Sequence, residues 1–117
     1  RDKRWDRIAK SWNVLCGSTL VTEFDSANDG IRSSYENAIG DEFIEPFKIS
    51  GVDGNMRSDD VVICSNFRTD RCRQVTTALT QKDLPEFGMH KIPLHFVTMT
   101  NYDDSFENIR VIYDKPN

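Results

Sequence analysis

Apolar residues recur in residues 5–16 with the spacing that places them on one face of an α-helix. They are Trp5, Ile8, Ala9, Trp12, Leu15 and Cys16. Gly17 follows, as a glycine that ends a helix would. We therefore predict a helix that packs both tryptophans into the core, with stacking of their rings on a ligand as the alternative.

The next two patterns predict a helix and an edge strand. Residues 25–29 are rich in helix-capping side chains and acids, and the apolar spacing after them predicts a helix to about Ala38, before Gly40. Residues 19–24 should form a connector. Residues 41–49 alternate apolar and polar side chains, which predicts a half-buried strand, and Pro46 places it at a sheet edge.

The longest β-branched run, Val61–Cys64, predicts a buried strand followed by a helix to about Thr80. Residues 83–88 have the composition of a loop or short helical turn, and residues 94–100 and 109–113 predict two more strands. Strands that alternate with helices predict an α/β fold, a layered sheet with flanking helices.

Composition narrows the class of protein. With 117 residues the chain is one domain or part of one, and its net charge of −4 argues against general nucleic-acid binding. It has no apolar run long enough for a membrane span, and three cysteines without a paired motif favour a reducing, cytoplasmic location. Because the sequence begins at Arg1 rather than at methionine, we interpret it as an excised fragment.

Arginines follow the strand at residues 61–64, where a helix is expected to begin. Arg68 and Arg71 are three positions apart, so on a first helical turn they would project from one face and could bind a phosphate or carboxylate. A structural network of salt bridges is the alternative. Asp70 could hold one guanidinium or cap the helix.

Other polar residues give weaker signals. Asp59 and Asp60 could bind a metal, but a polar start to the strand is the simpler interpretation. His90 and His95 lack the spacing of a metal pair. The basic side chains of residues 1–7 could be solvated or could lean over a neighbouring anion. The sequence contains no nucleophile motif, phosphate-binding loop or cluster of metal ligands, so we expect the reacting groups to lie elsewhere.

Two motifs resemble those of a known family. Residues 66–71 (NFRTDR) resemble the NFRxDR motif of cofactor-independent (2,3-bisphosphoglycerate-independent) phosphoglycerate mutases, and residues 1–7 (RDKRWDR) resemble the end of its MDRDxRWDR segment. Residues 41–46 and 80–103 also match in order and approximate spacing. The resemblance spans essentially the whole chain.

The resemblance implies that residues 1–117 are a partial transferase domain, its latter half. In that family the transferase domain is inserted in a phosphatase domain of the alkaline-phosphatase superfamily, which carries a serine nucleophile and two manganese or magnesium ions. The phosphoryl group moves between 3-phosphoglycerate and 2-phosphoglycerate through a phosphoserine. The nucleophile and the metal ligands lie outside this chain, so no catalytic residue, metal ligand or cofactor is expected within it.

The motif match also implies roles for three arginines. Arg1, Arg68 and Arg71 would bind phosphoglycerate in a cytoplasmic glycolytic isomerase, completed by the phosphatase domain of the same polypeptide. The isolated fragment should be inactive, without nucleic-acid or membrane partners. The alternatives are a non-catalytic module that binds anions and a structural half-domain without enzyme activity.

Overall fold

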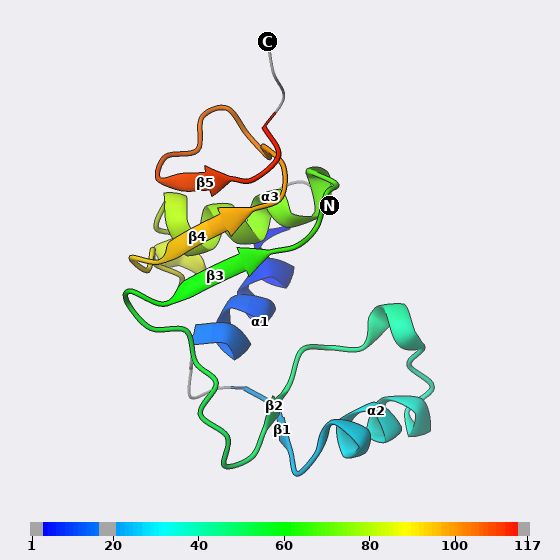
Figure 1. Cartoon of the computed structure of the whole chain (residues 1–117). Coiled ribbons are helices and arrows are strands. Elements are labelled where there is room, and N and C mark those ends of the chain that lie inside the picture. The colour runs from blue at the N-terminus through cyan, green and yellow to red at the C-terminus, as the bar shows by residue number, and fades with distance from the viewer. Residues whose placement is uncertain (1–3, 17–20, 115–117) are drawn as a thin grey trace.

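The structure is a computed structural model that describes residues 4–16 and 21–114, and it contains both helices and strands (Figure 1). The helices are α1 (Trp5–Cys16), α2 (Ala27–Glu36) and α3 (Asp70–Thr76), with short helical turns at Asp41–Phe43, Thr77–Gln81 and Pro85–Phe87. The strands are β1 (Glu23–Phe24), β2 (Lys48–Ile49), β3 (Val61–Cys64), β4 (His95–Thr98) and β5 (Ile109–Val111). Each strand pair is parallel, as an α/β fold requires.

The main body is built on a three-stranded parallel sheet in the order β3-β4-β5. Val61 pairs with His95, and Phe96 pairs with Ile109. All three strands were expected from the sequence, and the short helical turn at Pro85–Phe87 confirms the prediction for residues 83–88. The helix after β3 is also confirmed, because α3 continues into a π-helical turn that ends at Gln81.

The core lies between one face of this sheet and helices α1 and α3 (Figure 1). Trp12 is 5% exposed and Leu79 is 2% exposed. The sheet contributes Phe96 and, at its margin, Val62, Cys64 and Ile109. The apolar face of the first predicted helix is therefore confirmed as a core face. The glycine expected to end that helix lies outside the described residues.

The opposite face of the sheet is left open. Side chains alternate along each strand, and those pointing away from the helices are Val61, Ile63, His95, Val97 and Arg110. Val61 is 68% exposed and Ile63 is 60% exposed. The prediction of a fully buried strand at residues 61–64 was therefore wrong, because helices of the described chain cover only one face.

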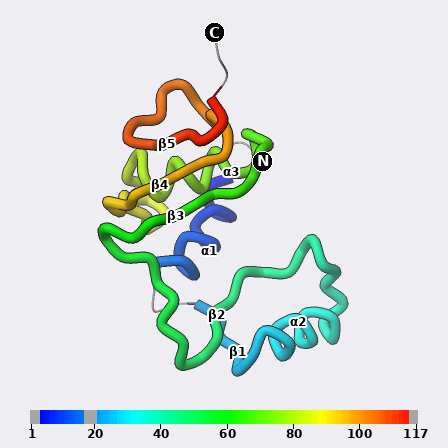
Figure 2. Tube along the Cα trace, in the orientation of Figure 1, coloured from blue at the N-terminus to red at the C-terminus, as the bar shows by residue number. Residues whose placement is uncertain are grey.

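A small lobe, residues 21–55, lies to one side of the main body (Figure 2). Ser26 caps α2 by accepting a hydrogen bond from the Asp29 amide at 3.1 Å, as the sequence predicted, but α2 ends at Glu36 rather than Ala38. Gly30 is needed there, since a Cβ would lie 2.3 Å from the ring of Phe47.

The strand predicted over residues 41–49 was wrong. Only Lys48–Ile49 is extended and paired, with β1 in the expected connector, and Asp41–Phe43 forms a 3₁₀ turn. Pro46 has no amide hydrogen to contribute to a ladder, which keeps the segment before β2 irregular. Within residues 4–16 and 21–114, no helix is long and apolar enough to cross a bilayer.

Candidate anion-binding site

The arginine loop, residues 65–71, joins the carboxyl end of β3 to the first turn of α3 (Figure 1). Arg68 precedes the helix and its side chain is 76% exposed, whereas Arg71 lies in the first helical turn and is exposed. The expectation that both arginines lie on that first turn was wrong, because α3 begins only at Asp70. Two exposed guanidinium groups still flank one strand end, where ligands bind in parallel sheets.

Asp70 connects the two arginines. Its carboxylate accepts a hydrogen bond from Arg68 Nη2 at 3.3 Å and one from the Arg71 amide at 3.0 Å. Partial desolvation acts to raise the pKa of Asp70, but Arg68, the amide hydrogen bonds and Arg71 together lower it below its usual value. Asp70 thus holds a guanidinium, and the helix-cap position belongs to Thr69.

Arg73 has a different environment from the other two arginines. It is half-buried, with Nε donating to the Tyr102 carbonyl at 2.9 Å and Nη2 donating to Thr69 Oγ1 at 3.2 Å. Both partners are protein atoms, so the Arg73 guanidinium is committed to structure. Of the three arginines here, Arg68 and Arg71 are the ones whose charges face solvent.

A second loop holds the arginine loop by its main chain. This is the Thr–Tyr loop, residues 99–103, which follows β4. Tyr102 donates its hydroxyl hydrogen to the Asn66 carbonyl at 2.6 Å, and Thr100 donates to the Phe67 carbonyl at 2.7 Å. The backbone that leads to Arg68 is therefore fixed by hydrogen bonds from the neighbouring strand's loop.

The described cysteines, Cys16, Cys64 and Cys72, are free thiols. Cys64 lies at the end of β3, with Sγ 3.3 Å from the Tyr102 hydroxyl. The pKa of Cys72 is raised to about 11, mainly by burial and to a smaller extent by a hydrogen bond with Cys64. Cys72, in the first turns of α3, is therefore a protonated and weakly polar thiol at neutral pH.

Cys72 should consequently react slowly with alkylating reagents at neutral pH. With a pKa of about 11, only roughly one Cys72 thiol in 10⁴ is ionised at pH 7, and this fraction grows about tenfold for each pH unit above it. Iodoacetamide labelling between pH 7 and 9, mapped by mass spectrometry, should show that increase. The same chain in urea is the control, and equal labelling rates in both states at pH 7 would contradict the burial argument.

The weaker candidates from the sequence, the two histidines and Arg4, do not come together in one site. His90 stacks edge-on against Trp12, with ring centroids 5.1 Å apart, and His95 lies on the open face with Nε2 3.8 Å from Asp59. No group of three potential metal ligands occurs within residues 4–16 and 21–114. Arg4 pairs with Asp6 at 3.2 Å, and Arg1 lies outside the described residues.

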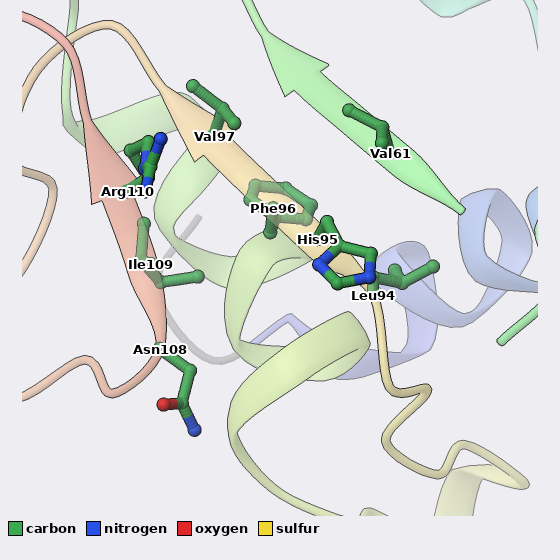
Figure 3. A pocket seen from close by; sticks show the side chains of 8 residues that line it. All are labelled: Val61, Leu94, His95, Phe96, Val97, Asn108, Ile109 and Arg110. Carbon is green, nitrogen blue, oxygen red and sulfur yellow. The ribbon is translucent and has the colours of Figure 1, made fainter. Parts of the chain in front are cut away.

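A hollow of about 800 Å³ also lies over the open face (Figure 3). Half of its eight lining residues are aliphatic, and all eight come from three strands and their ends. The lining residues are Val61, Leu94, His95, Phe96, Val97, Asn108, Ile109 and Arg110. Since the arginine loop contributes nothing to it, this hollow is part of the uncovered sheet face and is separate from the candidate anion site.

The sequence did not reveal the support of the arginine loop. Thr100 and Tyr102 lie 33 and 36 positions beyond the carbonyls that they hold. A hydroxyl that bonds a backbone carbonyl leaves no periodic trace in a sequence. The sequence predicted only an α/β fold, in which loops at the carboxyl ends of neighbouring parallel strands come together; that β3 and β4 are such neighbours was found from the structure.

Comparison with known proteins gives one consistent result. A family model described as BPG-independent PGAM N-terminus matches residues 1–104. The chain is 46% identical over its whole length to the 2,3-bisphosphoglycerate-independent phosphoglycerate mutase of Flavobacterium psychrophilum, of which it covers 24%. It is 42% identical over its whole length to that of Bacteroides fragilis, covering 23%. It is 40% identical over 97% of its length to that of Clostridium tetani, covering 22%. The chain spans about a quarter of the length of these relatives.

Proposed function

The chain belongs to the 2,3-bisphosphoglycerate-independent phosphoglycerate mutase family, and from this premise we propose that it supplies substrate-binding arginines to such an enzyme. The enzyme would interconvert 3-phosphoglycerate and 2-phosphoglycerate, as a cytoplasmic isomerase of glycolysis. In this proposal Arg68 and Arg71 bind the phosphoglycerate, and Arg1 joins them. The relatives' names support the reaction, and the geometry of the arginine loop supports the role of the residues.

The observation that carries the proposal is the pair of solvent-facing arginines at the end of β3. Arg68 is held by Asp70 at 3.3 Å and Arg71 has no ion pair within the described part of the chain. Guanidinium groups bind phosphoryl and carboxylate oxygens through paired hydrogen bonds, and phosphoglycerate carries both groups. Arg68 would exchange its contact with Asp70 for the stronger charge of the substrate.

The covalent chemistry would come from sequence outside the quarter that the chain matches. We propose that a phosphatase domain of the same polypeptide supplies the serine nucleophile and two manganese or magnesium ions. The arginines of this chain would then hold and orient the substrate and offset its negative charge. Parallel sheets normally have both faces covered, so the open face of Val61 and Ile63 would receive part of this additional chain.

A chimaera tests the proposal directly. Residues 1–117 would replace the matched quarter of the Flavobacterium psychrophilum relative, and conversion of 3-phosphoglycerate to 2-phosphoglycerate would be measured with manganese present. We expect mutase activity within about tenfold of the parent, because the two sequences are 46% identical over the whole chain. A folded, substrate-binding but inactive chimaera would favour a non-catalytic anion-binding module. A folded chimaera that binds no phosphoglycerate would favour a structural half-domain.

A further inference from the structure

We propose that Tyr102 is a positioning residue for the substrate-binding arginines, acting through the main chain of the arginine loop. This inference rests on the proposed function of Arg68 and Arg71. It adds a residue from a different loop, after β4, that would touch no substrate. Its contribution would be to fix where the arginine loop leaves the sheet.

The hydroxyl of Tyr102 is placed for this role. Tyr102 is 3% exposed, and its hydroxyl is 2.6 Å from the Asn66 carbonyl and 3.3 Å from Cys64 Sγ. A tyrosine hydroxyl has one hydrogen to donate, and the shorter contact takes it, so the Cys64 thiol can only donate to the oxygen. The pKa of Tyr102 is raised, mainly by burial and to a smaller extent by interactions with Cys64 and Cys72. The hydroxyl therefore keeps its hydrogen at neutral pH.

Further bonds tie the two loops into one unit. Thr100 Oγ1 donates to the Phe67 carbonyl at 2.7 Å, the position directly before Arg68. Arg73 Nε, from α3, donates to the Tyr102 carbonyl at 2.9 Å. Helix α3 therefore fixes Tyr102, and Tyr102 in turn fixes the arginine loop. Asn66 and Phe67 are thus anchored by consecutive carbonyls. The Arg68 side chain is exposed, and its placement depends on this backbone.

Small displacements matter at such a site. Paired hydrogen bonds from a guanidinium depend on direction as well as distance, and a misplacement of about 1 Å can cost around 10²-fold in rate. Removal of the Tyr102 hydroxyl leaves the ring packed and frees one carbonyl. The arginine loop would then sample positions in which Arg68 cannot reach a substrate held by the rest of the enzyme.

The test uses the active chimaera with Tyr102→Phe, Thr100→Val and the double variant. We expect Tyr102→Phe to lower kcat/KM for 3-phosphoglycerate about tenfold, with the thermal midpoint within about 3 °C of the parent. The double variant should lose more than either single one. Nitrogen-15 NMR of the arginine Nε groups should show the Arg68 signal shifted or broadened in Tyr102→Phe, a change that loss of stability alone would not produce.

Tyr35→Phe is the matched control. This variant also removes a tyrosine hydroxyl, but from the small lobe, where Tyr35 donates to Asp41. It should leave turnover unchanged. Normal kcat/KM in both Tyr102→Phe and the double variant would overturn the inference. A fall in kcat/KM accompanied by equal destabilisation and an unmoved Arg68 signal would overturn it as well. If Arg68→Ala also kept normal turnover, the proposed function itself would fail. If Arg68→Ala lowered turnover while Tyr102→Phe and the double variant kept it, the positioning role alone would fail.

Discussion

Replacement of Arg68 or Arg71 by alanine in the chimaeric mutase should lower kcat/KM by about 10²- to 10³-fold, the usual cost of losing one charged group that stabilises a transition state. Both side chains are exposed and lie outside the core cluster. Their removal should therefore change the free energy of unfolding by no more than about 0.5 kcal/mol. Steady-state kinetics and urea unfolding of the same preparations measure the two quantities.

Arg57→Ala is the control for the loss of an exposed arginine. Arg57 also pairs with a nearby aspartate, Asp53 at 2.7 Å, but in the turn before β3 rather than after it. It should keep full turnover. Lysine in place of Arg68 should restore only part of the rate, because an ammonium group lacks the planar pair of donors. Normal turnover in both alanine variants would show that Arg68 and Arg71 do not bind the substrate.

Replacement of Leu79 by alanine should destabilise the isolated chain by about 2–5 kcal/mol, a large share of the ~5–15 kcal/mol that holds a domain folded. Leu79 is 2% exposed, on the turn that continues α3, and it packs in the core cluster with Trp12 and Phe96. Removing its side chain leaves a cavity that rigid neighbours cannot fill. Urea unfolding monitored by tryptophan fluorescence measures this loss of stability, since Trp12 belongs to the same core cluster as Leu79.

The matched control is Ile63→Ala on the open face. It removes the same kind of side chain from a position that is 60% exposed, so it should cost less than about 1 kcal/mol. An equal loss of stability in the two variants would mean that the open face carries as much packing as the helix-covered face. That result would contradict the core as the structure has it.

The parts that could be predicted are those whose side chains repeat with a period. The helix around Trp12 and the strand at residues 95–98 were expected because a helix face recurs about every 3.6 residues and β-branched runs favour extended backbone. The same logic failed at residues 41–49, where an alternating pattern had no neighbouring strand along most of its length. Alternation permits a strand, but only pairing creates one.

Only part of the candidate site could be predicted from the sequence, because the placement of its side chains depends on tertiary contacts. Arg68 and Arg71 could be singled out because they follow a strand in a motif. That Arg68 would stand in the loop before the helix depended on where α3 begins. Arg73, from the same cluster in the sequence, bonds Thr69 and the Tyr102 carbonyl, partners that only tertiary structure brings near.

The hydrogen bonds that fix the arginine loop also set the order in which the site can form. A growing chain contains both arginines before it contains Thr100 and Tyr102, which lie 33 and 36 positions beyond the carbonyls that they hold. The loop therefore stays unanchored until β4 has been synthesised and has paired with β3. A ligand that needs the anchored arginines binds only chains that have completed this pairing, and its binding free energy then stabilises the parallel sheet as well as the loop.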